Sequence, residues 1–206
     1  MHTLISLQAI EHARARIAPS VTRTPLVALG ADDILLKAES LQPSGAFKLR
    51  GAFNALLGLD DSARVRGVVA HSSGNHAIAV AFAARTLGMP ATIVMPENAP
   101  AVKRQWVQSL GARLEIVGVA SSERLARAAA LAEAEGLALV EPYDAAPIIE
   151  GTGTLGLELL DDCATSDPLE IYVPVSGGGL IAGVAAAIKQ RRPRVRVIGV
   201  EPELAA

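Results

Sequence analysis

Cysteine is almost lacking in this 206-residue sequence, which contains one, Cys163. A single thiol cannot form an internal disulfide, so we expect a protein of the reducing cytoplasm. Aromatic residues are also scarce, at 3% of the chain, although half of all residues are hydrophobic. Small aliphatic side chains must therefore fill the core. This composition is typical of helices packed closely on parallel sheets.

Charge of one sign and long apolar runs are lacking as well. Nineteen basic residues nearly balance twenty-one acidic ones, so the chain has no electrostatic footprint of a nucleic-acid-binding protein. No apolar stretch reaches transmembrane length, and the first twenty residues lack the order of a secretory signal. We therefore expect neither nucleic acid nor a membrane as a partner.

Helical and strand patterns alternate along the chain, and glycine follows three of the predicted helices, a common stop signal. This alternation predicts an α/β fold with parallel sheets and right-handed crossovers. Helices are expected at 4–17, 46–58, 74–87, 100–110, 122–135, 151–161 and 179–190. Strands are expected at 34–36, which reads as buried, and at 65–70, 91–95, 114–117, 137–140, 171–175 and 195–200.

The predicted last strand, 195–200, lies close to the end of the sequence. Parallel strands are normally covered by helices on both faces. We therefore expect the α/β unit that contains this strand to be incomplete.

The segment SGAFKLRG (44–51) places a lysine on the first turn of a predicted helix. Partial burial and the helix dipole both disfavour the ammonium form of Lys48. A deprotonated amine is the nucleophile that Schiff-base chemistry requires. A lone lysine at a helix start is more often a surface residue, but Phe47 and the tight Ser44–Gly45 turn favour the chemical interpretation.

A second segment, HSSGNHA (71–77), lies where a predicted strand ends and a helix begins. Ligands bind at this edge of open α/β sheets, and the free backbone N–H groups of a helix start can hold a carboxylate. Asn75 could bond a ring hydroxyl, and a serine hydroxyl could move protons. An ordinary Ser/Asn helix cap explains the local sequence equally well.

A third segment, SGGGL (176–180), follows the predicted strand IYVPV and precedes a helix. Successive small residues expose backbone N–H groups at a helix N-terminus, which makes a nest for an anion such as phosphate. The spacing does not fit the dinucleotide pattern GxGxxG. Three consecutive glycines are also costly for a purely structural turn.

Together, the stretch 37–52, the SSGNHA segment and the SGGGL loop resemble the motifs of the serine/threonine dehydratase and serine racemase family in order and spacing. This family consists of pyridoxal-phosphate enzymes of fold type II, the tryptophan synthase β-like class. The resemblance covers essentially the whole chain, but the family's chains are longer, so the sequence looks C-terminally truncated. It implies two α/β domains, a large one (1–66 and 146–206, incomplete) and a small mobile one (67–145).

The resemblance also implies a role for each motif. Lys48 would carry pyridoxal phosphate, Phe47 would pack on its ring and Asn75 would bond its 3-hydroxyl. The phosphate would lie in the loop formed by Ser176, Gly177, Gly178, Gly179 and Leu180. The substrate carboxylate would be held by the segment containing Ser72, Ser73, Asn75 and His76.

The activity implied is elimination of water and ammonia from L-threonine or L-serine, giving a 2-oxo acid. Ser73 stands where serine racemases carry their second proton donor, so racemisation is an alternative. Ammonia-lyase activity on threo-3-hydroxyaspartate and an inactive, truncated cofactor-binding chain are further alternatives. The family's enzymes are commonly homodimers. Thr152 stands where the family often has glutamine, with no consequence that the sequence defines.

A divalent cation is the last expectation that the resemblance raises. Glu201 matches the first ligand of the family's cation site, and the carbonyl of Ala205 would match the second. The carboxylate expected next would lie beyond residue 206. Within this sequence a surface role for Glu201 is the better interpretation.

Overall fold

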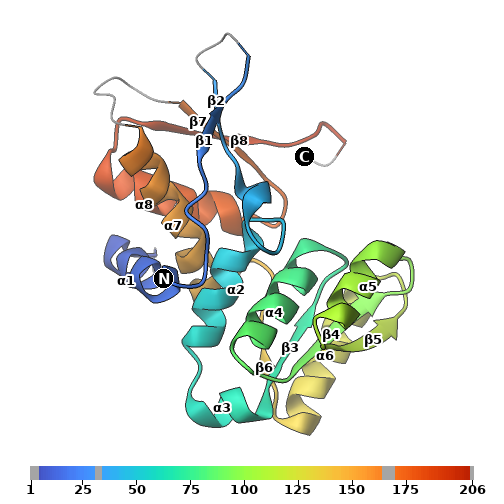
Figure 1. Ribbon diagram of the computed structural model, residues 1–206. Helices are drawn as coiled ribbons and strands as arrows, with labels where there is room; N and C mark the ends of the chain where they lie inside the picture. The colour runs from blue at the N-terminus through green and yellow to red at the C-terminus, as the bar shows by residue number, and fades with distance from the viewer. Residues whose placement is uncertain (1–4, 31–33, 164–169, 205–206) are drawn as a thin grey trace.

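The computed structural model describes residues 5–30, 34–163 and 170–204 (Figure 1). Its helices are α1 (Leu7–Ile17), α2 (Lys48–Leu57), α3 (Asp61–Arg66), α4 (Asn75–Thr86), α5 (Ala101–Ser109), α6 (Ser121–Glu135), α7 (Ala146–Asp162) and α8 (Gly179–Arg191), with a 3-10 helix η1 (Glu39–Leu41). Its strands are β1 (Leu26–Ala28), β2 (Leu35–Lys37), β3 (Val68–His71), β4 (Ala91–Pro96), β5 (Arg113–Val117), β6 (Ala138–Leu139), β7 (Glu170–Pro174) and β8 (Arg196–Val200).

A four-stranded parallel sheet, in the order β5-β4-β3-β6, forms the first α/β unit. Alternate side chains of its strands enter different cores. Val68 and Ala70 pack in the core that also contains α4 and α2, whereas Val69 packs with Ala128 and Leu131 of α6. The unit therefore has three layers, with the sheet between two sets of helices.

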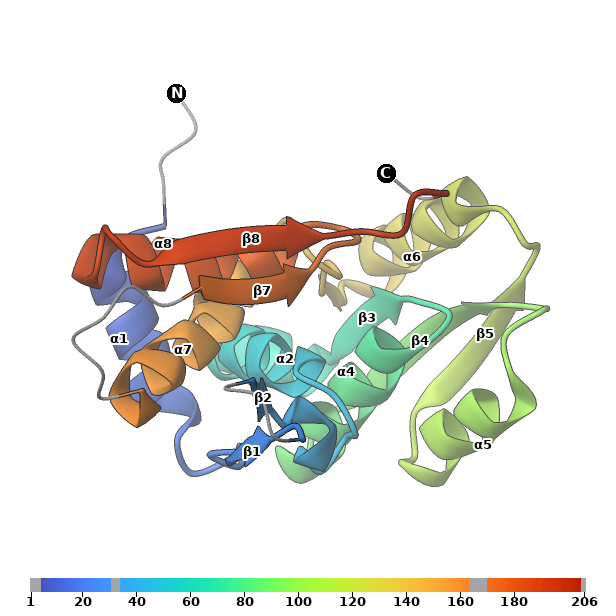
Figure 2. The same ribbon diagram turned by 90° about the horizontal axis from the view of Figure 1, so that it is seen from above.

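The second unit contains two further pairs of strands. β1 and β2 pair antiparallel, and β7 and β8 pair parallel. Val173 of β7 packs with Leu155 of α7 and Val184 of α8 in a separate core. Figure 2 shows β7 and β8 lying together along one side of the helices α7 and α8.

Glycine stop signals were predicted correctly. Gly88, Gly111 and Gly136 follow α4, α5 and α6 with φ angles of 67°, 83° and 66°. This left-handed backbone is accessible to glycine and rarely to other residues. The parallel strands described above also confirm the predicted α/β fold class.

The strand predicted at 65–70 begins three residues late. Val65 and Arg66 belong to the short helix α3. Asp60 caps this helix, because its Oδ1 accepts a hydrogen bond of 2.8 Å from the backbone N–H of Ala63. The cap holds the chain helical up to Gly67, and β3 starts only at Val68.

The helix predicted at 151–161 begins five residues early, at Ala146, with a proline in its first turn. Its glycines therefore lie inside the helix. A Cβ atom on Gly151 would lie 2.6 Å from the carbonyl oxygen of Arg50 in α2. One on Gly153 would lie 2.9 Å from Ile10 of α1. These glycines allow neighbouring helices to approach closely.

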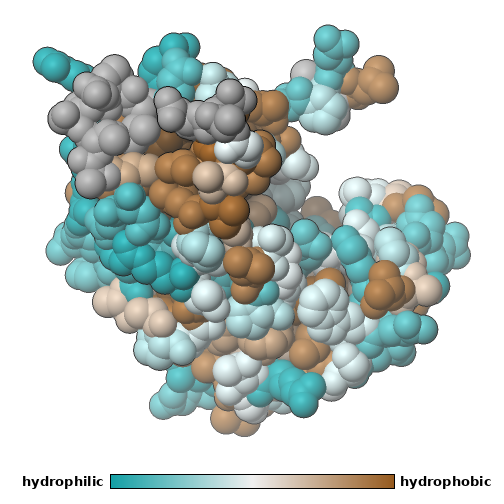
Figure 3. Space-filling view, turned by 45° about the horizontal axis from the view of Figure 1, so that its top comes forward, coloured by the Kyte–Doolittle hydropathy of each residue, from teal (hydrophilic) through white to brown (hydrophobic). Residues whose placement is uncertain are grey.

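The strand predicted to be buried at 34–36 is instead half exposed. Ile34, Leu35 and Leu36 have 49%, 52% and 47% of their surface accessible. With Tyr172 of β7 and Leu159 of α7 they line an apolar groove of about 600 Å³. Figure 3 shows hydrophobic side chains gathered on this face. The remaining predicted elements agree with the structure to within about two residues, except the first helix, which begins at Leu7 and not at residue 4. Residue 4 itself lies outside the described part.

Candidate active site

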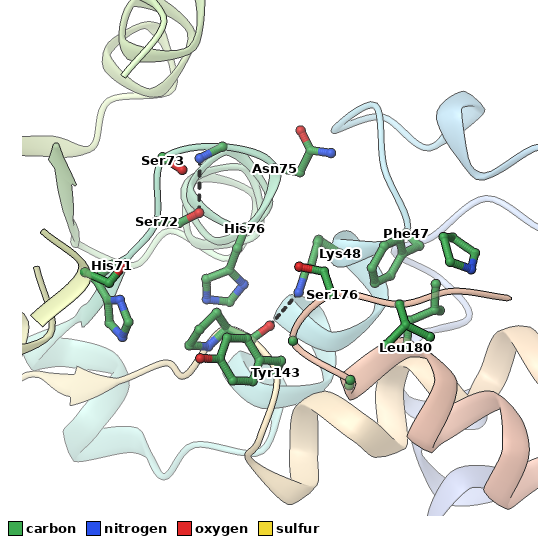
Figure 4. Close-up of a pocket in the computed structure, with 18 of the residues that line it drawn as sticks. Phe47, Lys48, His71, Ser72, Ser73, Asn75, His76, Tyr143, Ser176 and Leu180 are labelled. Atoms are coloured by element: carbon green, nitrogen blue, oxygen red, sulfur yellow. Dashed lines mark hydrogen bonds between the residues drawn. The ribbon is translucent and has the colours of Figure 1, made fainter. Parts of the chain in front are cut away.

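All three sequence motifs line one cavity of about 570 Å³. It lies where β3 and β7 end, at the carboxyl edge of the strands, and where α2 begins. Figure 4 shows Lys48 and Phe47 on one side, the segment from His71 to His76 on another, and Ser176 with Leu180 on a third. The predicted convergence of these segments is therefore present in the fold.

Lys48 is the first residue of α2 and follows the tight turn at Gly45, whose φ is 73°. Its Nζ donates a hydrogen bond of 2.6 Å to the carbonyl oxygen of Pro142. The same atom lies 5.3 Å from the ring centroid of Phe47. Burial lowers the pKa of Lys48 below its usual value. The structure thus places a partly desolvated amine at the cavity wall, where it is a better nucleophile than a surface lysine.

The segment 71–77 does not form an ordinary helix cap. Gly74 is the N-cap residue of helix α4. Among the described residues, no side chain accepts a capping hydrogen bond from the first turn of this helix. The Oγ of Ser72 accepts instead from the N–H of Gly74, at 3.1 Å. Ser73 and Asn75 are exposed, and both line the cavity. The N–H groups of the first turn of α4 are thus left to bind an anion.

His76 differs from its neighbours because its side chain is buried, with 3% exposed. Its Nε2 lies 3.1 Å from the carbonyl oxygen of Val140. A carbonyl only accepts, so Nε2 carries the proton and Nδ1 is bare. Nδ1 has no hydrogen-bond partner among the described residues. Burial lowers the pKa of His76 to about 4. The ring is therefore neutral at pH 7, which leaves the backbone N–H of His76 as the group for the predicted carboxylate contact.

This histidine predicts a pH dependence of stability. Its folded pKa of about 4 lies below the ordinary 6.5. The neutral ring therefore stabilises the fold fully above pH 6.5, and this contribution is lost as the pH falls toward 4. The loss amounts to about 3 kcal/mol. His76→Gln should flatten the fall in unfolding free energy, measured by urea titration between pH 7.5 and 4.5. His12→Gln, at an exposed histidine of α1, should keep the parental slope, and equal slopes in the two variants would contradict the assignment.

The loop 176–180 joins β7 to α8, and its glycines have a second function besides exposing N–H groups. Gly178 adopts φ 83°. A Cβ atom on Gly177 would clash with the ring of Tyr143, and one on Gly179 would lie 2.5 Å from the carbonyl oxygen of Tyr143. The loop can approach Tyr143 this closely only because these side chains are missing.

Several cavity residues lie outside the three motifs and were not predicted from the sequence, among them Lys103, Arg124 and Tyr143. Lys103 donates from Nζ to the Oδ1 of Asn75 at 3.3 Å. Arg124 donates to the carbonyl oxygen of Val119 and to the Oγ of Ser121, both at 2.8 Å. Each cation belongs to a helix that follows a strand of the β3–β5 sheet. That position at the ligand-binding edge is the signal that could have identified both cations.

The predicted cation site gains no support from these residues. Glu201 is exposed, and the described ranges contain no group of three or more His, Cys, Asp or Glu side chains placed to hold a metal. Ala205 lies outside the described residues. Among the residues that the structure describes, no helix is long and apolar enough to cross a bilayer.

The donor set fits pyridoxal phosphate. The partly desolvated amine of Lys48 suits its aldehyde, and the glycine loop at the start of α8 suits its phosphate. Fold and site together define a pyridoxal-phosphate enzyme of fold type II. More particularly, the chain belongs to the pyridoxal-phosphate dependent enzyme family, whose model matches residues 17–206.

Three individual proteins are similar to this chain over nearly its whole length. The catabolic L-threonine dehydratase TdcB of Staphylococcus aureus (strain USA300) is 42% identical over 97% of this chain. The solved structure of maize serine racemase is 41% identical over 98% of the chain, with a TM-score of 0.93. The solved structure of T.th. threonine deaminase is 44% identical over 96%, with a TM-score of 0.89. The chain spans 59%, 62% and 65% of these three proteins respectively.

Proposed function

We propose that this chain forms the lysine- and phosphate-binding part of a pyridoxal-phosphate ammonia-lyase that eliminates water and ammonia from L-threonine or L-serine. The observation that carries the proposal is the meeting of Lys48, the uncapped start of α4 and the glycine loop in one cavity (Figure 4). The identities to threonine dehydratase and threonine deaminase support the reaction class.

In this proposal the two ends of the cofactor have different partners. Lys48 would attach it covalently, and Phe47 would pack against its ring. Asn75 would bond the 3-hydroxyl, and the N–H groups of 176–180 would hold the phosphate. When bound, pyridoxal phosphate supplies an electron sink for the charge left on the substrate's α-carbon.

The substrate's carboxylate is then held at the start of α4. The hydroxyls of Ser72 and Ser73 and the backbone N–H groups of Asn75 and His76 surround it. Lys48, displaced from the cofactor by the substrate's amino group, would then take the α-proton with its freed amine, a task for which its lowered pKa suits it. The β-hydroxyl leaves as water, and the released enamine hydrolyses to a 2-oxo acid and ammonia.

The function is tested by following 2-oxo acid formation from L-threonine and L-serine with cofactor added. We expect 2-oxobutyrate and pyruvate respectively. The same assay should include threo-3-hydroxyaspartate, because Lys103 and Arg124 place two cations on the cavity wall that could hold a second carboxylate. Cofactor held on Lys48 without any 2-oxo acid would contradict the elimination and favour a binding-only chain.

Serine racemisation is the second candidate, favoured by the exposed hydroxyl of Ser73 on the cavity wall and by the likeness to maize serine racemase. A hydroxyl placed across the site from Lys48 could return the proton to the opposite face of the α-carbon. Ser73→Ala should then abolish D-serine formation from L-serine and keep most of the pyruvate formation, because Ser72 and the N–H groups at the start of α4 still hold the carboxylate. Equal loss of both products would argue against a separate role for Ser73.

We also propose that residues 67–145 form a small mobile domain, with 1–66 and 146–206 in the larger one. The β3–β6 sheet lies within the first range, and both remaining strand pairs lie within the second. The ring of Phe53 meets that of Phe82 edge to face across this boundary, 6.5 Å apart. A homodimer, a cation at Glu201 and cytoplasmic residence stay predictions.

A further inference from the structure

Helix α7 connects the two ends of the candidate site. It packs against α2, which begins with Lys48, and against α8, which begins inside the glycine loop. Figure 1 shows α7 beside α8. The contacts are backbone to backbone. A Cβ atom on Gly151 would lie 2.7 Å from the Cα of Gly51, and one on Gly183 would lie 2.6 Å from the N of Gly153. Helices this close leave little freedom for the lysine and the loop to move apart.

Thr152 of α7 makes the direct connection to the loop. Its side chain is buried, with 1% exposed. Its Oγ1 lies 3.0 Å from two carbonyl oxygens, those of Ile149 and Gly179. The first is the usual back-bond of a threonine within its own helix. The second crosses 27 residues of sequence to the glycine that begins α8, and the single hydroxyl proton is shared between the two acceptors.

The loop needs an anchor of this kind. Consecutive glycines are the most permissive backbone in a protein, and Gly178 adopts a left-handed conformation. N–H groups converge on an anion only while such a loop keeps one shape. Among the described residues, the hydroxyl of Thr152 is the only side-chain donor to a carbonyl oxygen of residues 176–180.

We propose that Thr152 is a positioning residue that holds the glycine loop in the shape that binds the phosphate of pyridoxal phosphate. This inference rests on the proposed function, because it takes the loop as the phosphate site. The expected effect is confined to the phosphate end of the cofactor site. Loss of the hydroxyl loosens the loop, whereas the amine of Lys48, at the start of a different helix, keeps its place.

The experiment compares pyridoxal phosphate with pyridoxal, which has the same ring and aldehyde but no phosphate. Apparent affinities of the whole chain for each are measured by titration, and the adduct is trapped with borohydride and located on Lys48 by peptide mass mapping. The parent should prefer the phosphorylated ligand. Thr152→Val should reduce that preference about five-fold, the effect of losing one buried hydrogen bond. Thr152→Ser, which keeps the hydroxyl, should restore it.

Thr154→Val is the matched control. Thr154 lies two residues further along the same helix and is equally buried, with 1% exposed. Its Oγ1 bonds the carbonyl oxygen of Gly151 and accepts from Arg50, away from the loop. Its loss should leave the preference for the phosphate unchanged. If Thr152→Val does not fold, Thr152→Ala removes the same hydroxyl without adding an apolar methyl at its place.

The outcomes separate the two proposals. An unchanged preference in Thr152→Val or Thr152→Ala would overturn the positioning role. Equal weakening of both ligands would overturn it too, because that result is general destabilisation. A parent chain that traps neither ligand on Lys48 would contradict the proposed function itself, and this inference with it.

Discussion

Replacing Lys48 with alanine should lower 2-oxo acid formation by about four orders of magnitude, the upper range for loss of a positioned acid–base group. In the proposed mechanism one amine both attaches the cofactor and takes the α-proton, so both functions disappear together. The amine is placed for this by the start of α2 and by its hydrogen bond to Pro142. The rate is measured with L-threonine under saturating cofactor.

Two comparisons make that result specific. Lys189→Met removes a lysine of α8 that bonds the carbonyl oxygens of Pro193 and Val195, at the opposite end of the helix from the glycine loop. It should keep the parental rate. A small amine such as methylamine, added to Lys48→Ala, should restore part of the lost rate by replacing the missing base. A Lys48→Ala variant with the parental rate would exclude the proposed role.

The second large effect concerns stability and centres on Arg50. This residue follows Lys48 by two positions and is completely buried. Its guanidinium bonds both oxygens of Glu39, at 2.8 and 2.7 Å, and both oxygens of Glu158, at 2.7 and 2.9 Å. Burial opposes ionisation of Glu158, but the hydrogen bonds of Arg50 and Lys37 outweigh it and lower the pKa of that carboxyl. The charged side chains of Arg50, Glu39 and Glu158 therefore stabilise one another, and removing Arg50 leaves both carboxylates without their shared cation.

Arg50→Met should destabilise the fold by about 4 kcal/mol, because it leaves two carboxylates without their shared cation. The free energy of unfolding is measured by urea titration at pH 7. The loss should shrink at acidic pH, where protonation removes the stranded charges. A loss below about 1 kcal/mol at pH 7 would show that this network does not hold α2 in place.

Arg14→Met is the matched control. Arg14 of α1 forms an ion pair of 2.6 Å with Asp161, also on α7, but its side chain is 34% exposed. A pair so accessible to water contributes little, so the variant should lose less than about 1 kcal/mol.

The sequence was sufficient for much of the fold because its signals are local. Glycine stops, alternating apolar patterns and the three motifs each depend on a few neighbouring residues. A local signal was also overlooked at α3, where Asp60 is a good helix cap. Pro147 in the first turn of α7 similarly marks the early start of that helix.

Other features depend on contacts between distant segments. The glycines at 177 and 179 fit against Tyr143, and those of α7 fit against α1, α2 and α8, but no periodicity encodes these partners. The neutral state of His76 follows from its burial against Val140. The exposure of Ile34 to Leu36 could not be foreseen either, since an apolar triplet is ordinarily buried.

The most direct test of the site is to ask which residue holds the cofactor. The chain is incubated with pyridoxal phosphate, reduced with borohydride and digested, and the modified peptide is identified by mass spectrometry. We predict that the modification falls on Lys48, and that Lys48→Ala carries none. Modification spread over several surface lysines, or concentrated on Lys103, would contradict the central claim that position 48 is the cofactor lysine.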